Sequence, residues 1–236
     1  GKIEAEWLDE MEFSAGIGRL WAHRADPGPA ALTAYLEAVA ALNPDGSLRH
    51  YPGSPALAGQ WLRPQDRALL LELHPQAQLA LKKNLRRDSR ISVHARDCYE
   101  GLPALVPPPI RRGLVLLDPS YEIKDEYRKI VALTAAAFKR WGDASYAIWY
   151  PLLGAARHLE LLAALQRSAM PGILVTELTV ADRDETGGMY GSGMAIVNAP
   201  WQTDHTLAAL LPAVADLLAP VRSAIDCIVN FGSCAG

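Results

Sequence analysis

Three acidic residues each follow a short apolar run, at the points where strands are predicted to end. They are Glu72 after Leu70-Leu71, Asp97 after the run 91–95, and Asp118 after the run 114–117. In an open sheet of parallel strands, ligands bind outside the carboxyl ends of the strands, so we expect the three carboxylates to line one crevice. A carboxylate there can accept hydrogen bonds from both hydroxyls of a ribose, and one after the next strand can accept from the amine of adenine. Each acid alone is more commonly a helix N-cap, but the ordered set favours a site for an adenosine-bearing cofactor.

The last acid opens a second chemical feature, the run Asp118-Pro119-Ser120-Tyr121. Pro119 cannot donate to a strand ladder, so the chain must leave the sheet at that point. A carboxylate followed by the aromatic ring of Tyr121 at a sheet edge suits a flat group that carries an amine. An ordinary turn from strand to helix is the alternative interpretation of the same four residues.

The elements that must hold these residues alternate between strands and helices. Strands are expected at 67–73, 91–95, 114–117, 146–150, 173–180, 194–197 and 225–231, and helices at 75–87, 99–106, 124–141, 153–168 and 203–218. This alternation predicts an α/β fold with a mostly parallel, doubly wound sheet. A loop rather than a helix joins the strands at 173–180 and 194–197, which predicts one antiparallel strand near the C-terminus.

The first 48 residues have a different pattern. Apolar residues at near-helical spacing predict helices at 3–23 and 30–42, separated by Pro27-Gly28-Pro29. We therefore expect a small helical insertion at 1–48 and the main domain at 49–236. Within that domain, Ser54 before Pro55 is the expected N-cap of a short helix.

Composition limits the partners of the chain. The 236 residues carry a net charge of −3, so a protein that coats nucleic acid through overall positive charge is excluded, although a local nucleic-acid surface is not. The richest basic stretch is 82–90, for which a solvated helix face is the plainer interpretation. No apolar run is long enough for a membrane span, three widely spaced cysteines indicate a reducing cytoplasm, and no ligand spacing predicts a metal site.

Several sequence blocks together resemble a known family. In chain order they are Tyr-Pro-Gly-Ser-Pro at 51–55, Glu-Leu-His-Pro at 72–75, Asp97, Leu-Leu-Asp-Pro-Ser-Tyr-Glu at 116–122, Tyr-Ala-Ile-Trp-Tyr-Pro at 146–151, and the segment 193–201. The set resembles the bacterial S-adenosylmethionine-dependent 23S rRNA adenine-N6 methyltransferases, once labelled as proteins needed to use external DNA as a nutrient. The resemblance covers nearly the whole chain and implies a Rossmann-like methyltransferase domain with a small helical insertion.

The resemblance also implies roles for individual residues. Ser54 and Glu72 are implied to contact S-adenosyl-L-methionine, Glu72 at its ribose, while Asp97 and Cys98 are implied to lie at its adenine. Asp118 is implied to contact the cofactor and to begin the catalytic motif. The implied reaction is methyl transfer to the N6 amine of an unpaired or flipped adenine in 23S rRNA.

The chemistry of adenine suggests a separate role for each residue of the catalytic motif. The Asp118 carboxylate and the Pro119 carbonyl can accept both N6 protons, and Tyr121 can stack on the target base, an interaction typically worth about 1–3 kcal/mol. The family motif usually has a second proline where this chain has Ser120. That serine is available to cap the helix that follows.

A second departure concerns the N-terminus. The family has an N-terminal segment with the first strand of the sheet and a Gly-rich loop that cradles the methionine part of the cofactor, and we expect it to be missing before Gly1. The Gly-rich stretch at 231–236 would serve only through circular permutation, and no helix follows it. We therefore expect a gap at the centre of the sheet, weak or no cofactor binding, and little or no activity in this chain.

Two other functions remain open from the residues. One is a DNA adenine-N6 methyltransferase or DNA-utilisation factor, because the motif recognises the base and not the sugar. The other is a non-catalytic nucleic-acid-binding module that keeps a methyltransferase fold.

Overall fold

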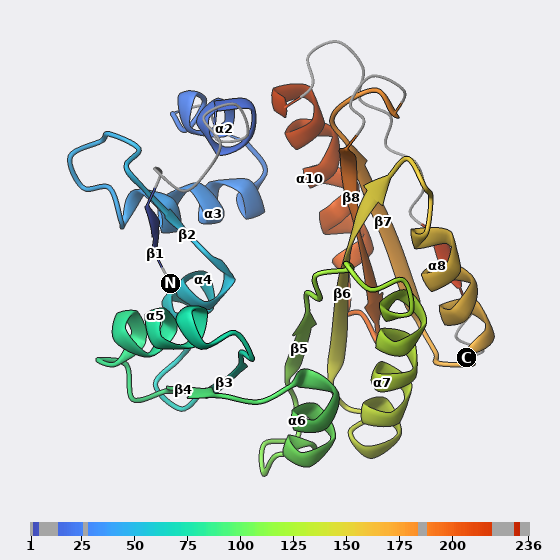
Figure 1. The fold of residues 1–236 in the computed structure, drawn as a ribbon. Coiled ribbons are helices and arrows are strands. Elements are labelled where there is room, and N and C mark those ends of the chain that lie inside the picture. The colour runs from blue at the N-terminus through green and yellow to red at the C-terminus, as the bar shows by residue number, and fades with distance from the viewer. Residues whose placement is uncertain (1, 5–13, 26–27, 184–187, 219–228, 232–236) are drawn as a thin grey trace. The chain divides into compact units, whose positions relative to one another are not determined.

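The chain folds into two compact units, residues 1–101 (unit 1) and 102–236 (unit 2), which are described separately. The computed structural model describes residues 2–4, 14–25, 28–183, 188–218 and 229–231 (Figure 1). The unit boundary differs from the expected boundary between residues 48 and 49, and the division into an insertion and a main domain stays a prediction. Within the described residues, no helix is both long and apolar enough to cross a membrane.

Unit 1 begins with a small β-ribbon and a pair of helices. Its elements are β1 (Lys2–Glu4), a π-helix (Ser14–Gly18), α2 (Arg19–Ala22), α3 (Ala30–Ala40), β2 (His50–Pro52), α4 (Ser54–Trp61), β3 (Ala68–Leu71), α5 (Pro75–Leu85), β4 (Ile91–His94) and α6 (Cys98–Leu105), which continues into unit 2. Residues 2–4 form a strand rather than the start of the expected helix at 3–23, because they pair antiparallel with β2, where Lys2 faces Pro52. Strands β3 and β4 form a parallel two-stranded sheet, with Ala68 opposite Ile91.

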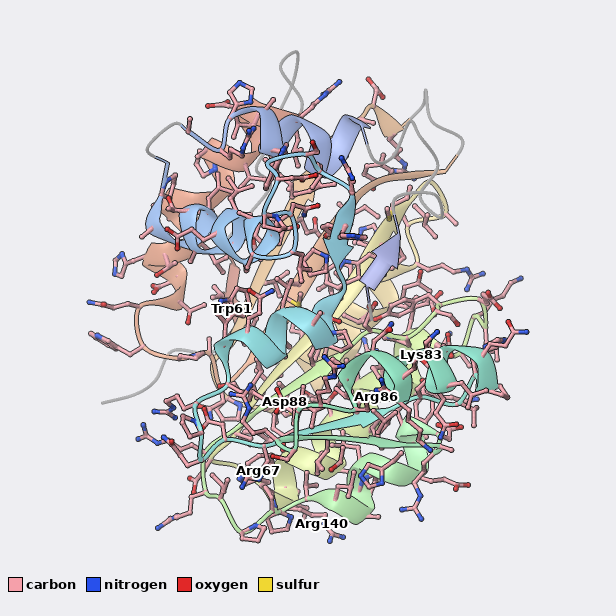
Figure 2. All side chains as sticks on the ribbon, turned by 90° about the vertical axis from the view of Figure 1, so that its left-hand side faces the viewer. Trp61, Arg67, Lys83, Arg86, Asp88 and Arg140 are labelled. Carbon is pink, nitrogen blue, oxygen red and sulfur yellow. The ribbon has the colours of Figure 1, made fainter. Side chains whose placement is uncertain are left out.

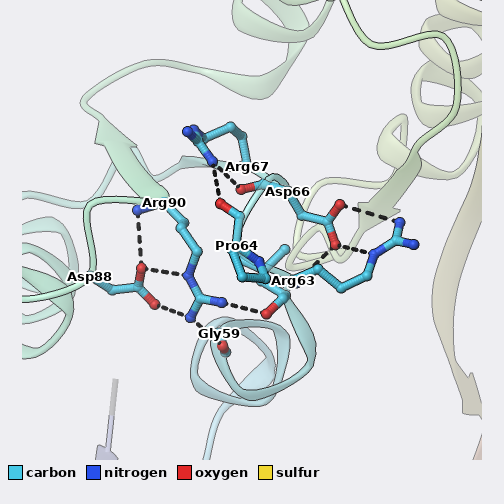
Figure 3. A network of polar contacts seen from close by, with 8 residues as sticks. Gly59, Arg63, Pro64, Asp66, Arg67, Asp88 and Arg90 are labelled. Atoms are coloured by element: carbon cyan, nitrogen blue, oxygen red, sulfur yellow. Dashed lines mark hydrogen bonds and ion pairs between the residues drawn. The ribbon is translucent and has the colours of Figure 1, made fainter.

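One arginine ties the end of α4 to the turn before β4 (Figure 3). The guanidinium of Arg90 donates to both carboxylate oxygens of Asp88, at 2.9 and 2.6 Å. It also donates to the backbone carbonyls of Gly59, at 2.9 Å, and Leu62, which belong to the last turn of α4 and to its C-cap. This guanidinium therefore supplies the donors that a helix C-terminus lacks, and it fixes α4 against the start of β4.

Unit 2 is a mixed five-stranded sheet with the order β5-β6-β8-β7-β9. Its elements are β5 (Leu114–Leu117), α7 (Glu126–Arg140), β6 (Ser145–Leu153), α8 (His158–Arg167), β7 (Ile173–Thr179), β8 (Met189–Val197), α10 (Thr203–Leu218) and β9 (Val229–Phe231). Figure 1 shows α7 and α8 on one side of this sheet and α10 on the other. The α/β prediction is confirmed. The predicted antiparallel strand is β8, which pairs antiparallel with β6 and β7, and β9 also runs antiparallel to β7.

A glycine explains one of the sequence blocks in unit 2. Tyr150 on β6 and Glu177 on β7 lie on either side of Gly193 on β8, and the Tyr150 hydroxyl donates to the Glu177 carboxylate at 2.8 Å. A Cβ at Gly193 would lie 2.2 Å from the tyrosine ring, so only glycine lets that ring cross the middle strand. The glycine of the 193–201 block therefore has a structural reason that is independent of catalysis.

Strands β3 and β5 each keep one free edge among the described residues, as β4 and β9 also do: β3 pairs only with β4, and β5 pairs only with β6. Leucines on both strands are unusually exposed for a sheet, with exposed fractions of 47% for Leu69, 68% for Leu114 and 46% for Leu116. A strand that reads as buried on both faces normally lies inside a sheet. Each of these two strands has one neighbouring strand among the described residues, and the expectation of a missing strand stays a prediction.

Candidate active site

The first set of predicted site residues lies in unit 1, where two acids follow adjacent parallel strands. The backbone N–H of Glu72 donates to the carbonyl of His94 at 3.1 Å, so the ladder between β3 and β4 continues to Glu72. Asp97 follows three residues after His94. Neighbouring strands lie about 4.8 Å apart, so Glu72 and Asp97 are placed at the same carboxyl edge of this sheet, as predicted.

Both acids also bind the backbone at the start of a helix. A carboxylate oxygen of Glu72 accepts from the N–H of His74, the N-cap of α5, and one of Asp97 accepts from the N–H of Tyr99 in α6, each at 2.8 Å. The alternative capping role is therefore real for Asp97, whereas Glu72 binds the N–H of the N-cap residue itself and does not cap α5. Among the described residues, the second oxygen of each carboxylate makes no hydrogen bond, and a carboxylate can accept through both oxygens. Each acid can hold its backbone partner and still accept from a ligand.

Ser54 and Cys98 each begin a helix in the same unit. Ser54 is the first residue of α4 and exposed, and Gly53 rather than Ser54 is the N-cap, so the expected capping role is wrong. Because no side chain caps this helix, the Ser54 hydroxyl is available to a ligand. Cys98 is half-buried and follows Asp97 directly. The four residues fit an adenosine-bearing group, because they offer acceptors for hydroxyl and amine protons at one sheet edge and beside it.

The second set lies in unit 2, at the end of β5. Leu117 is paired with Ile148, so Asp118 is the first residue beyond the ladder and lies beside Trp149 of β6. Its side chain is exposed, yet protein atoms around the carboxylate exclude part of its water and raise the pKa of Asp118. Pro119 follows, half-buried. A carboxylate with partial desolvation at a strand end is suited to accept protons from a bound amine.

Tyr121 has an unusual backbone and a covered ring. Its φ is +56°, a left-handed conformation that is costly for a residue with a side chain and is often found at functional sites. The ring is only 7% exposed and lies 4.4 Å from the ring of Tyr127, between centroids. Its hydroxyl donates to the backbone carbonyl of Trp149 at 2.6 Å. Stacking of Tyr121 on a base, which stays a prediction, therefore requires this loop to rearrange when the substrate binds.

Ser120 does not take the role expected for it. It is exposed, and α7 begins only at Glu126 with Asp125 as its N-cap. The turn after Pro119 is instead held by Tyr121. The sequence had given no sign of this, because the partner atom is a backbone carbonyl 28 residues away. Knowledge of the pairing between β5 and β6 would have been needed to place Trp149 beside Asp118.

The predicted residues thus fall into two sets, one in each unit. Ser54, Glu72, Asp97 and Cys98 belong to unit 1, and Asp118, Pro119 and Tyr121 to unit 2. The expectation that all three acids line one crevice stays a prediction. Over the part of the chain that the structure describes, no group of three histidine, cysteine or acidic side chains could hold a metal ion.

The chain has an α/β fold with acids at the carboxyl ends of parallel strands, and one of these acids is the first residue of an Asp-Pro-x-Tyr motif. This combination defines a Rossmann-like methyltransferase. Comparison with known proteins gives the family. The model of "Ribosomal RNA large subunit methyltransferase D, RlmJ" matches residues 4–227, and the chain belongs to this family. The family prediction from the sequence is thereby confirmed.

Individual relatives agree with this assignment. The chain is 38% identical over 209 residues to the Ribosomal RNA large subunit methyltransferase J of Escherichia coli K12, which covers 89% of this chain and 74% of that protein. The protein of the same name from Haemophilus influenzae is 38% identical over 210 residues, with the same coverage. A crystal structure of a Legionella pneumophila protein superposes with a TM-score of 0.87 at 30% identity, covering 95% of this chain and 82% of that one.

Proposed function

We propose that this protein transfers the methyl group of S-adenosyl-L-methionine to the N6 amine of an adenine in 23S rRNA. The observation that carries the proposal is the position of Asp118-Pro119 directly after β5, where the chain leaves the sheet with a partly desolvated carboxylate and a carbonyl in succession. Family membership supports the reaction class and the kind of RNA.

The adenine amine requires activation because its lone pair is delocalised into the ring. The Asp118 carboxylate and the Pro119 carbonyl accept the two N6 protons, which favours a pyramidal nitrogen with its lone pair directed at the methyl group. Bond formation from N6 to the methyl carbon breaks the carbon–sulfur bond, whose electron pair stays on sulfur. N6 then gives up one proton, which a carboxylate oxygen of Asp118 can hold and pass to water. The protein contributes orientation and electrostatics.

The cofactor supplies the reactive methyl group when it is bound, and unit 1 supplies the residues for its adenosine part. Glu72 accepts from the ribose hydroxyls through the oxygen that does not bind the N–H of His74. Asp97 accepts from the adenine amine through the oxygen that does not bind the N–H of Tyr99. Ser54 and Cys98 complete the set.

The substrate adenine must be unpaired or flipped out of its helix. In a duplex, its N6 amine is hydrogen-bonded to the partner base and its ring is stacked between neighbouring bases. Tyr121 then either stacks on that base or, in the arrangement of this structure, fixes the loop that carries Asp118. The partner is 23S rRNA.

Transfer of labelled methyl groups to unmodified 23S rRNA tests the proposal. Single-turnover conditions, with protein in excess over RNA, make slow transfer measurable. We expect incorporation at adenine N6 that is lost in Asp118→Ala and strongly reduced in Glu72→Ala, while Asp125→Ala, an exposed acid of the same loop, keeps it. Transfer to duplex DNA but not to rRNA would replace the proposal by a DNA methyltransferase. Survival of transfer in Asp118→Ala would show that the catalytic acid is misassigned.

A further inference from the structure

The strongest local charge in unit 1 lies at the C-terminal end of α5 and in the turn after it. We define the basic end as Lys82, Lys83, Arg86 and Arg87, all of which are exposed. Lys82 and Lys83 lie in the last turn of α5, and Arg86 and Arg87 follow directly after its last residue, so the four cations are grouped at one helix end. This concentration contrasts with the net charge of −3 for the whole chain.

The charge of the basic end is not neutralised nearby. Asp88 is the one acid in the sequence 75–90, and its carboxylate is held by the guanidinium of Arg90 at 2.6 and 2.9 Å. Within the described residues, Lys83, Arg86 and Arg87 form no ion pair. Cations in the last turn of a helix are favoured by its dipole, which accounts for Lys82 and Lys83. The same dipole favours Arg86, the C-cap, while Arg87 lies one residue further on.

The surface beside these cations is hollowed and polar. A hollow of about 320 Å³ lies between the end of α5 and strand β4, lined by Lys82, Leu85, Arg86, Ile91, Ser92 and Val93. Strand β4 pairs with β3 on one side only among the described residues. Backbone groups on its other edge can therefore bind a ligand next to the two cations.

An exposed aromatic ring belongs to the same region of unit 1. The last turns of α4 and α5 line one further hollow of about 300 Å³, to which Gly59 and Gln60 contribute from α4 and Asn84 and Leu85 from α5. Trp61, the last residue of α4, is 56% exposed. Figure 2 labels Trp61 at the end of α4, Lys83 on α5 and Arg86 just after α5.

We propose that the basic end and Trp61 bind the rRNA outside the target adenine. The cations contact consecutive phosphates, and the indole of Trp61 stacks on an unpaired base, the combination by which proteins hold single-stranded nucleic acid. The proposal rests on the proposed function only in taking rRNA as the partner. The α5 helix is about 16 Å long, so its basic C-terminal end is remote from Glu72, which precedes its N-terminus. The surface therefore contacts flanking nucleotides and not the methylated one.

Salt dependence of RNA binding tests the electrostatic part. The full chain and two triple alanine variants are titrated onto unmodified 23S rRNA between about 50 and 200 mM salt. The test variant removes Lys83, Arg86 and Arg87. The control removes three exposed cations of unit 2: Arg112, Lys129 and Lys139. We expect affinity to fall on the order of tenfold and the salt slope to decrease by about two in the test variant only, since each phosphate contact contributes about 0.7 for a single strand.

Two further variants separate charge from folding and from stacking. Arg86→Lys with Arg87→Lys keeps the charges and should restore the salt slope, whereas a purely structural role of the guanidiniums would not be rescued. Trp61→Ala should weaken binding without changing the slope. Thermal unfolding of every variant identifies any that is misfolded.

Several outcomes would overturn the proposal. They are equal slopes in the two triple variants, no RNA binding by the parent chain, or binding of the basic end to phosphatidylglycerol vesicles instead of RNA. Methyl transfer is measured separately. Its absence together with the expected change of slope would reject the proposed reaction and leave the RNA surface standing.

Discussion

The hydroxyl of Tyr121 donates a 2.6 Å hydrogen bond to the backbone carbonyl of Trp149. This bond joins the loop after Asp118 to the strand next to it, in a unit where Asp118 itself is only one residue beyond the β5–β6 ladder. The loop that carries the proposed catalytic carboxylate is therefore anchored at its start, by the strand ladder, and again at Tyr121. The geometry of this loop depends on the side chain of Tyr121, which was expected to stack on the target base.

Tyr121→Phe tests this anchor. The variant keeps the ring against Tyr127 and leaves the carbonyl of Trp149 unpaired, so we expect stability to fall by about 1 kcal/mol and the rate of methyl transfer to fall more than cofactor affinity. Tyr146→Phe is the matched control, because the hydroxyl of Tyr146 also donates to a backbone carbonyl, that of Trp141 at 2.9 Å. It should lose similar stability in denaturant titrations but no activity. Equal rates in the parent and Tyr121→Phe would mean that the bond has no catalytic relevance.

Asp118→Asn should reveal the cost of the partly desolvated carboxylate. Because its pKa is raised in the folded state, folding is penalised once Asp118 ionises, and this penalty is present above the raised pKa and disappears as pH falls below the unfolded value. We expect the asparagine variant to unfold at a higher temperature than the parent at about pH 8, and the difference to shrink toward about pH 4. Methyl transfer by the parent should decline as acid protonates the same carboxylate. A difference in melting temperature that does not vary with pH would contradict the assigned cause.

Gly193→Ala should distort the centre of the unit 2 sheet. The added methyl group would lie 2.2 Å from the ring of Tyr150 and force it away from Glu177. Overpacking of this kind typically costs about 1–3 kcal/mol, which urea unfolding can measure. Gly154→Ala is the control, since a Cβ there meets nothing within 4 Å. If both substitutions cost the same, the close approach of Tyr150 is not what requires glycine.

Arg90→Lys should weaken unit 1 although it keeps the charge. Lysine cannot reproduce the fork that contacts Asp88 and the carbonyls of Gly59 and Leu62 together. We expect a lower melting temperature and weaker cofactor binding, because α4 carries Ser54 at its other end. Arg63→Ala, which breaks the more exposed pair with Asp66, should have a smaller effect. A larger effect of Arg63→Ala would show that the contacts of Arg90 add little.

The parts of the fold that sequence patterns predicted are those with local causes. The run 114–117 followed by Pro119 identifies both a strand and its end, and β5 ends at Leu117 as expected. Residues 3 and 4 were wrongly predicted as the start of a helix, because their strand depends on pairing with residues 50–52, which no local pattern reveals. The acids at 72 and 97 were placed correctly at one sheet edge, because consecutive parallel strands share it.

The candidate site was harder to predict at the positions where contacts of backbone atoms determine how a side chain is placed. The covered ring of Tyr121 follows from a positive φ and from a carbonyl on another strand, and neither is visible in residue types. The N-cap of α4 shifted from Ser54 to Gly53, a one-residue change that leaves the serine hydroxyl available. Such details depend on register, and register is settled by the packed sheet.

The free edges of β3 and β5 have a practical consequence for handling the protein. Among the residues that the structure describes, each presents unpaired backbone groups and carries exposed leucines, among them Leu69 on β3 and Leu114 on β5. Such edges are templates for strands of other molecules, so concentrated solutions of this chain should aggregate by edge-to-edge pairing. A charged residue in place of Leu114, which is 68% exposed, should raise the concentration at which light scattering first increases.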